Sequence, residues 1–175
     1  MKTFLALIII SAITSSPAAM ARGKKTDLGG ALAGQVSVVD GDTLELHGQR
    51  IRIFGIDAPE SSQLCEAKTG KSWRCGAAAA NALSTFIASR PVECMPRDRD
   101  RYQRVVAQCQ VAGMDIGAWL VGSGWALAFR RYSTDYVLAE TRAAQGRRGI
   151  HDSYFVAPWD YRRDSKDRLQ IRPSR

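Results

Sequence analysis

The sequence predicts an α+β protein of five short strands and three helices. Three observations lead to this prediction. An apolar run early in the chain is followed by two short segments in which apolar and polar residues alternate, which is the pattern of strands. One helical segment then precedes two further β-rich runs, and two more helical segments follow. We therefore expect five strands, with a helix between the third and the fourth, in one domain over 34–160.

The first three strands are expected at 35–39, 43–46 and 49–56. Asp40–Thr43 (DGDT) is a turn signal between the first two strands, and His47-Gly48 is a second one. In the third strand, apolar residues occupy one face and arginines the other. Pro59 ends that strand and fixes the approach to Glu60.

The first helix is expected at 76–89, because its apolar residues recur at the spacing of one buried face, and Pro91 ends it. Short strands at 92–95 and 105–111 flank the charged turn 96–104. Two further helices are expected at 116–122 and 135–145. Asp115 and Thr134 are their predicted N-caps.

The two ends of the chain are expected to lie outside the folded domain. Residues 1–21 resemble a signal peptide, with Lys2, an apolar stretch over 4–13 and a small-x-small cleavage signature at Ala19–Ala21. That stretch is too short for a membrane anchor. We expect an exported protein, periplasmic or extracellular, with no anchor after cleavage. Residues 22–33 are predicted to be a flexible leader, and 161–175 a basic tail that frays beyond Trp159.

The charge of the chain favours polyanionic partners. Its formal net charge is +8, and removal of the signal peptide takes away only Lys2, which leaves about +7. Nucleic acid, anionic polysaccharide or a membrane surface would all suit such a charge, which also serves solubility alone. A monomer is the default expectation.

Four cysteines in an exported chain suggest two disulfides, for which three pairings are possible. We favour Cys65–Cys75, which closes the loop after Glu60, and Cys94–Cys109, which links two adjacent strands. Each short loop would contribute about 2–3 kcal/mol by restricting the unfolded chain. A zinc site is disfavoured, because no CxxC pair exists and neither histidine is near a cysteine in sequence.

Three acids and one arginine stand out between Val38 and Glu60. The pattern Asp-Gly-Asp-Thr, followed by Arg-x-x-Gly-x-Asp-x-Pro-Glu, resembles the staphylococcal (micrococcal) thermonuclease family. The resemblance continues through 100–104 and 124–126, and it covers about 34–159. It implies a five-stranded OB-fold barrel with three α-helices, whose mouth faces nucleic acid.

The resemblance also implies a role for each residue of the pattern. Asp42, Asp57 and the backbone carbonyl of Ala58 would bind one Ca²⁺, which prefers hard oxygen ligands. Relatives carry threonine at the position of Ala58, but a backbone ligand tolerates that change. Glu60 would be the general base that activates water. Two further catalytic residues would stabilise the phosphate charge in the transition state: Arg52 and Arg104.

One residue departs from the family pattern. Gln103 stands where relatives usually have glycine, and glycine permits a positive φ that Gln adopts less easily. Substrate contact is expected from Tyr132, at the position of a pocket tyrosine in relatives, and from two rim residues, Arg101 and Tyr102. The alternative for Tyr132 is packing against the barrel.

The sequence thus predicts a secreted, Ca²⁺-dependent endonuclease that cleaves DNA and RNA with little sequence specificity and leaves 3′-phosphates. Only two histidines, His47 and His151, are present, which argues against nucleases built on histidine bases. Two alternatives are a non-catalytic nucleic-acid-binding OB-fold protein and an accessory protein of exopolysaccharide or envelope metabolism. Both would use the same surface without hydrolysis.

Overall fold

The main sheet forms the body of the protein. The computed structural model describes residues 30–170, so the expected signal peptide lies outside the described residues. The sheet strands, in spatial order, are β1 (Leu32–Gly34), β8 (Val92–Arg99), β9 (Val105–Val111), β4 (Gln49–Ile53), β3 (Thr43–Leu46) and β2 (Ser37–Asp40), and β10 (Met114–Asp115) also pairs with β9. The strand pairs are antiparallel except β4 with β9, which are parallel. The parallel pair requires a crossover, which the first helix supplies.

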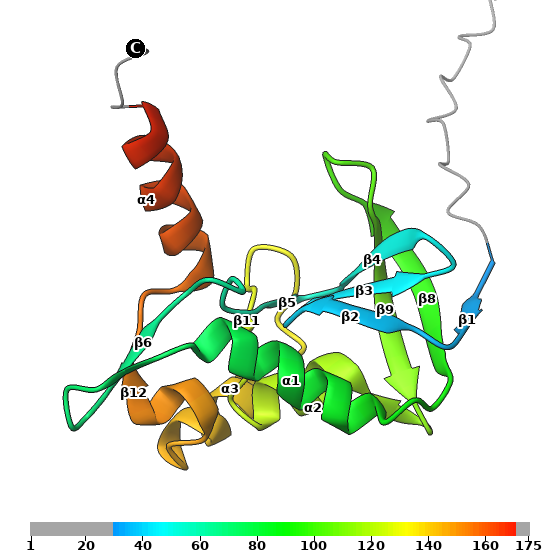
Figure 1. Ribbon diagram of the computed structural model, residues 1–175. Helices are drawn as coiled ribbons and strands as arrows, with labels where there is room; N and C mark the ends of the chain where they lie inside the picture. Colours follow the sequence, from blue (N-terminus) through cyan, green and yellow to red (C-terminus); the bar gives the residue numbers. More distant parts are fainter. Residues whose placement is uncertain (1–29, 171–175) are drawn as a thin grey trace, which may run out of the picture.

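The sheet curls into an open half-barrel, and three helices cover one side of it (Figure 1). These are α1 (Cys75–Ile87), α2 (Ile116–Gly122) and α3 (Val137–Gln145). Leu83 and Ile87 of α1 are buried in the same apolar core as Leu44 and Ile51 of the sheet. The predicted α+β, OB-like fold class is confirmed, with more strands than expected and with a fourth helix. The strand predicted at 92–95 continues to Arg99 as β8, so the charged turn is shorter than the expected 96–104.

The fourth helix, α4 (Pro158–Gln170), extends on the other side of the sheet (Figure 1). The sequence predicts a fraying tail from 161, because this segment is polar and has no apolar face long enough to predict a packed helix. The chain is instead helical up to Gln170. None of the described helices has the length and apolar character needed to cross a membrane.

The predicted caps have different outcomes. Asp115 caps α2 as expected, since its carboxylate accepts the N–H of Ala118 at 2.9 Å. The third helix begins at Val137 rather than 135, and its N-cap is Tyr136, which makes no side-chain cap bond. Tyr136 is turned into the core, where its hydroxyl donates to Asp115 at 3.1 Å. The prediction of Thr134 as the cap is therefore wrong, because burial of Tyr136 decides where the helix starts.

Several very short strands were not predicted. They are β5 (Ile56–Asp57) paired with β11 (Leu127–Ala128), and a three-stranded sheet of β6 (Cys65–Ala67), β7 (Ser72–Trp73) and β12 (Ser153–Tyr154), preceded by a 3₁₀ helix at Gly149–Asp152. At the start of the fold, Leu32–Gly34 pair with β8, whereas the sequence predicts a leader up to 33. Segments of two or three residues are too short for alternation to reveal.

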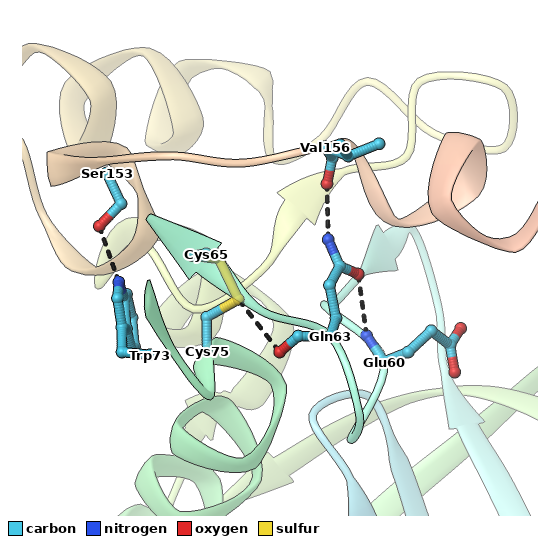
Figure 2. The surroundings of a disulfide bond; sticks show 7 residues. All are labelled: Glu60, Gln63, Cys65, Trp73, Cys75, Ser153 and Val156. Atoms are coloured by element: carbon cyan, nitrogen blue, oxygen red, sulfur yellow. Dashed lines mark hydrogen bonds between the residues drawn. A yellow bond between two sulfur atoms is a disulfide. The ribbon is translucent and has the colours of Figure 1, made fainter. Parts of the chain in front are cut away.

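Both favoured disulfide pairings are present. Cys94 and Cys109 face each other across β8 and β9. Cys65–Cys75 joins β6 to the first residue of α1 and lies next to the Glu60 loop (Figure 2). All four cysteines are buried.

Candidate active site

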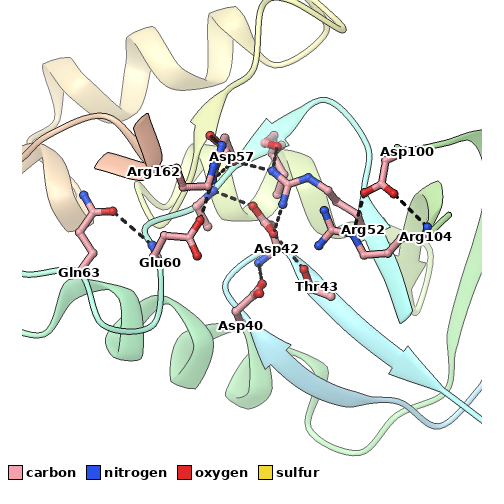
Figure 3. Close-up of polar contacts among 12 residues, drawn as sticks. Asp40, Asp42, Thr43, Arg52, Asp57, Glu60, Gln63, Asp100, Arg104 and Arg162 are labelled. Carbon is pink, nitrogen blue, oxygen red and sulfur yellow. Dashed lines mark hydrogen bonds and ion pairs between the residues drawn. The ribbon is translucent and has the colours of Figure 1, made fainter. Parts of the chain in front are cut away.

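Two buried carboxylates share one guanidinium at the centre of the site (Figure 3). Asp42 lies in the turn before β3, Arg52 on β4 and Asp57 on β5. Arg52 Nη1 donates to Asp42 Oδ1 at 2.6 Å, and its Nη2 donates to Asp57 Oδ1 at 2.5 Å. The two acid side chains are only 5% and 0% exposed. Arg52 therefore holds together two acids that would otherwise repel each other.

The local fold brings these three residues together. In the β3–β4 hairpin Thr43 lies opposite Arg52, which places the preceding Asp42 at the end of the arginine side chain. The N–H of Ala58 donates to Asp42 Oδ2 at 2.9 Å and fixes the end of β5 on the same carboxylate. Burial raises the pKa of Asp42, and the nearby Asp57 adds to this, while Arg52 opposes it.

Glu60 lies in a loop that a buried glutamine organises. Its side chain is 36% exposed. Gln63 Oε1 accepts the N–H of Glu60 at 3.2 Å, and the N–H of Gln63 donates to the carbonyl of Glu60 at 2.7 Å. The Gln63 side chain also donates to the carbonyl of Val156 at 2.7 Å (Figure 2). Gln63 thus fastens the loop of Glu60 to the segment that precedes α4. Nothing in the sequence indicates this role beyond the closeness of Gln63 to Cys65.

Arg162 of α4 is a site residue that sequence reasoning missed. Its Nη2 donates to Asp57 Oδ2 at 2.7 Å, while its Nη1 donates to Asp57 Oδ1 at 3.1 Å and to Glu60 Oε1 at 2.8 Å. Burial alone would lower the pKa of Arg162, but hydrogen bonds and charge from the two carboxylates outweigh it and raise the pKa. Arg162 therefore links Glu60 to Asp57, one of the two buried acids (Figure 3).

Arg104 stands beside this cluster rather than inside it. β4, which carries Arg52, pairs in parallel with β9, and Ile51 lies opposite Val105, the first residue of β9. Arg104 immediately precedes β9 and therefore lies at the end of the strand next to that of Arg52. Asp100 accepts the side-chain Nε of Arg104 at 2.7 Å and its backbone N–H at 3.0 Å. Burial alone would raise the pKa of Asp100, but these bonds and a further one from the backbone of Tyr102 outweigh it and lower the pKa.

The turn that carries Arg104 contains the expected backbone anomaly. Gln103 has φ +63°, the left-handed conformation that glycine adopts most readily. The N–H of Gln103 donates to the carbonyl of Asp100 at 2.9 Å, so the turn closes in spite of the side chain. The departure at Gln103 therefore costs conformational energy, while Arg104 still reaches Asp100.

We expect Gln103→Gly to raise the free energy of unfolding by up to about 1 kcal/mol, because glycine relieves the positive φ. Urea denaturation followed by tryptophan fluorescence measures it. Gln110→Gly is the matched control, since Gln110 lies exposed in β9, where glycine weakens a strand and lowers stability. A loss of stability at Gln103 similar to that at Gln110 would contradict the expectation.

The start of α1 presses against the backbone of Glu60. A Cβ added to Gly76 would lie 1.7 Å from the carbonyl oxygen of Glu60, a contact that only movement of the backbone can relieve. We expect Gly76→Ala to displace the Glu60 loop, lower stability by about 1–3 kcal/mol and lower any activity of Glu60 by about 10²-fold. Thermal unfolding and initial rates of nucleic-acid hydrolysis measure the two effects.

Gly122→Ala is the control for this substitution. Gly122 ends α2, and an added Cβ there would meet nothing within 4 Å. That variant should keep full activity. An active Gly76→Ala variant would show that the loop tolerates the shift.

The three candidate substrate-binding residues are exposed on two loops. Tyr102 and Tyr132 are 62% and 61% exposed, and Tyr132 packs edge-to-face on Phe129 with 5.0 Å between ring centroids. Arg101 lies over the Tyr102 ring at 5.0 Å. The β8–β9 tip and the loop after β11 project on the same side of the sheet as α4 (Figure 1). Within the described chain, none of the three forms a hydrogen bond or ion pair with Asp42, Asp57 or Glu60.

The donor set suits a hard cation that takes most of its ligands from elsewhere. Asp42 Oδ2 and Asp57 Oδ2 each accept one protein hydrogen bond, from Ala58 and Arg162, so each oxygen keeps a lone pair. Within residues 30–170, no three or more His, Cys, Asp or Glu residues gather as a metal-binding group. Ca²⁺ takes six to eight oxygens, so backbone carbonyl, water and substrate would have to complete its shell.

A separate groove of about 950 Å³ runs along the other face of α4. Aromatic and basic side chains line it, among them Phe129, Arg130, Arg131, Phe155, Trp159 and Arg163. Trp159 stacks on Phe129 with 5.6 Å between centroids. The first turn of α4 therefore separates this groove from the acid cluster that Arg162 contacts.

Comparison with known proteins identifies relatives of this chain. The family model described as staphylococcal nuclease homologue matches residues 50–153, more than half of the chain. An uncharacterized endonuclease of Escherichia coli is 33% identical over 135 residues, which cover 73% of this chain and 82% of that protein. The micrococcal nuclease of Shigella flexneri is 31% identical over 150 residues, covering 75% and 80%.

A third relative has a different name. The succinoglycan biosynthesis protein ExoI of Rhizobium meliloti (strain 1021) is 45% identical over 95 residues, covering 53% of this chain and 50% of that protein. This chain thus spans about half the length of that relative. The family match includes Arg52, Asp57, Glu60 and Arg104, and together with the geometry it means that the chain belongs to the staphylococcal nuclease homologue family.

Proposed function

We propose that this protein is a phosphodiesterase of the endonuclease type, exported and Ca²⁺-dependent, which cleaves DNA and RNA with little sequence preference and leaves 3′-phosphates. The observation that carries the proposal is the Arg52 fork between two buried acids, with Glu60 joined to them through Arg162. Family membership and relatives named as nucleases support the reaction class. Two disulfides support an oxidising compartment, periplasmic or extracellular.

The proposal assigns Asp42, Asp57 and the carbonyl of Ala58 to one Ca²⁺. When bound, the ion would neutralise charge on the phosphate and position it for attack. The Oδ2 atoms of Asp42 and Asp57 each keep a lone pair, and the three carboxylates of the site outnumber its two guanidiniums, Arg52 and Arg162, which supports a cation as an occupant.

Glu60 is proposed to accept the proton of the attacking water. It is the most exposed of the three acids, so water can reach it, and Oε2 accepts no hydrogen bond from the described residues. Arg52 and Arg104 are proposed to stabilise the charge of the pentacoordinate transition state. Asp100 binds Nε of Arg104, and the described chain offers no hydrogen-bond partner to its two Nη atoms, which leaves them for phosphate oxygens.

Substrate binding is assigned to Tyr132, Arg101 and Tyr102. Exposed tyrosines stack on bases of any sequence, and arginines follow the phosphates. The excess of basic residues, +8 over the whole chain, favours the same partner. No base-reading motif is present in the sequence, so weak sequence preference is expected.

Removal of the metal should abolish the activity. The purified protein is incubated with denatured DNA or with RNA, in Ca²⁺ or in excess chelator, and products are separated on a gel and their ends identified. We expect cleavage with Ca²⁺, none with chelator, and recovery when Ca²⁺ is restored. Arg104→Ala should reduce the Ca²⁺-dependent rate. DNA that is bound but left intact with Ca²⁺, Mg²⁺ and Mn²⁺ would refute the nuclease.

A second candidate function is an accessory role with an anionic polysaccharide. The likeness to ExoI favours it, and the groove beside α4 joins aromatic rings, on which sugars stack, to Arg130 and Arg131, which suit acidic groups. The two candidates are separated by measuring both binding and hydrolysis with an acidic polysaccharide and with single-stranded DNA. Polysaccharide binding without any nucleic-acid cleavage would favour the accessory role.

A further inference from the structure

We propose that Arg162 is a positioning residue, which fixes the general base Glu60 relative to the metal ligand Asp57. This inference rests on the proposed nuclease function and deepens it. Arg162 lies outside the matched family region, which ends at residue 153, and 102 residues separate it from Glu60 in the chain. α4 would therefore complete the active site rather than follow it as a tail.

The geometry of the guanidinium carries the proposal. A single nitrogen, Nη1, donates both to Glu60 Oε1 at 2.8 Å and to Asp57 Oδ1 at 3.1 Å. The second nitrogen, Nη2, holds Asp57 Oδ2 at 2.7 Å. Because one atom serves both acids, the base has a fixed distance from the fully buried Asp57.

The same contact selects which oxygen of Glu60 can react. Oε1 is held by Arg162, whereas Oε2 accepts no hydrogen bond from the described chain. A glutamate that is 36% exposed would otherwise occupy several rotamers, and each would direct the carboxylate to a different place. Arg162 restricts these rotamers and leaves one oxygen free to take a proton from water.

The helix that carries Arg162 is anchored on two sides. Trp159, one turn earlier, stacks on Phe129, and the carbonyl of Val156 accepts the Gln63 side chain at 2.7 Å. Gln63 in turn binds the backbone of Glu60 at 3.2 Å. The backbone of Glu60 and the helix that supplies Arg162 are thus linked twice, once through Gln63 and once through the arginine itself.

The role of Arg162 differs from that of Arg104. Both Nη atoms of Arg162 already bind carboxylates, whereas those of Arg104 have no such partner in the described chain. A lysine could supply the charge of Arg162 but not its planar two-nitrogen contact. Lysine substitution therefore separates positioning from mere neutralisation.

The test compares Arg162→Gln, Arg162→Lys and Arg162→Ala with Arg163→Gln. Arg163 is the matched control, because it is the next residue of the same helix, is 67% exposed, and within the described residues forms ion pairs with Asp160 and Asp164 and none with the acid cluster. Rates are measured with single-stranded DNA in saturating Ca²⁺, together with Ca²⁺ affinity by calorimetry and thermal unfolding. Guanidinium ion, with urea as its control, is added to Arg162→Ala.

We expect Arg162→Gln to lower kcat by about 10²-fold with little change in KM, since the base is misplaced while the DNA contacts remain. Arg162→Lys should recover only a minor part of the loss, and guanidinium, but not urea, should partly restore Arg162→Ala. Arg163→Gln should behave as wild type. Ca²⁺ should still bind to Arg162→Gln with affinity at least equal to wild type, because a competing positive charge has been removed.

Other results would overturn the inference in distinguishable ways. A wild-type kcat in Arg162→Gln would refute the positioning role of Arg162 but would leave the proposed nuclease function intact. A raised KM with unchanged kcat would make Arg162 a substrate contact, and a parallel loss of kcat and melting temperature in both the Arg162→Gln and Arg163→Gln variants would make it a structural residue of the helix. A wild-type protein that binds Ca²⁺ and DNA without cleavage would refute the proposed nuclease, and this inference with it.

Discussion

Glu60→Gln should lower kcat for DNA hydrolysis by about 10²–10⁴-fold while DNA binding persists. Glutamine keeps the size of the side chain and one oxygen that can accept from Arg162, but it cannot take a proton from water. The measurement is single-turnover cleavage of a labelled oligonucleotide in Ca²⁺, with binding followed by fluorescence anisotropy in chelator. Loss of hydrolysis with retained binding would identify Glu60 as the base.

Glu66→Gln is the matched control for this substitution. Glu66 is an exposed glutamate in β6, a few residues further along, and it has no contact with the acid cluster. The same change of charge there should leave kcat unchanged. An equal loss of kcat in both variants would attribute the effect to the net charge of the loop. An unchanged kcat in Glu60→Gln would show that Glu60 is not the general base.

Arg52→Gln should lower the free energy of unfolding by about 3–5 kcal/mol, as expected when one partner of a buried ion pair is removed. Asp42 would lose its only ion-pair partner within the described chain, and Asp57 would keep only Arg162. The uncompensated acids have little access to water, being 5% and 0% exposed. Urea denaturation without metal measures the loss, and added Ca²⁺ should recover part of it.

Arg50→Gln is the control here. Arg50 lies two positions earlier on β4 and is exposed, so its loss should change stability by less than about 0.5 kcal/mol. If Arg52→Gln lowers the free energy of unfolding no more than Arg50→Gln does, the Asp42–Arg52–Asp57 bridge contributes no more to stability than a surface ion pair.

Much of the fold and part of the site are determined by the sequence alone, because the signals are local. The boundaries of α2 and its Asp115 cap follow from residues within one helical turn. In β3, Leu44 and Leu46 are buried and Glu45 between them is less buried, as the alternation predicts, and the turn before β3 carries Asp42 at the point where the chain must reverse. Asp42, Arg52 and Asp57 meet because the β3–β4 hairpin and the short β5 that follows it bring them together.

The tertiary structure alone decided the rest of the site. Gln63 acts through Val156, which is 93 residues away, and Arg162 acts on Glu60 and Asp57 from 102 and 105 residues away. No local pattern encodes such contacts. Moreover, α4 is too polar for its sequence to predict a packed helix, since its attachment rests on Trp159 and on charge rather than on an apolar stripe. Sequence determines elements whose stabilising partners are close in the chain, whereas polar contacts between distant segments exist only once the fold has brought them together.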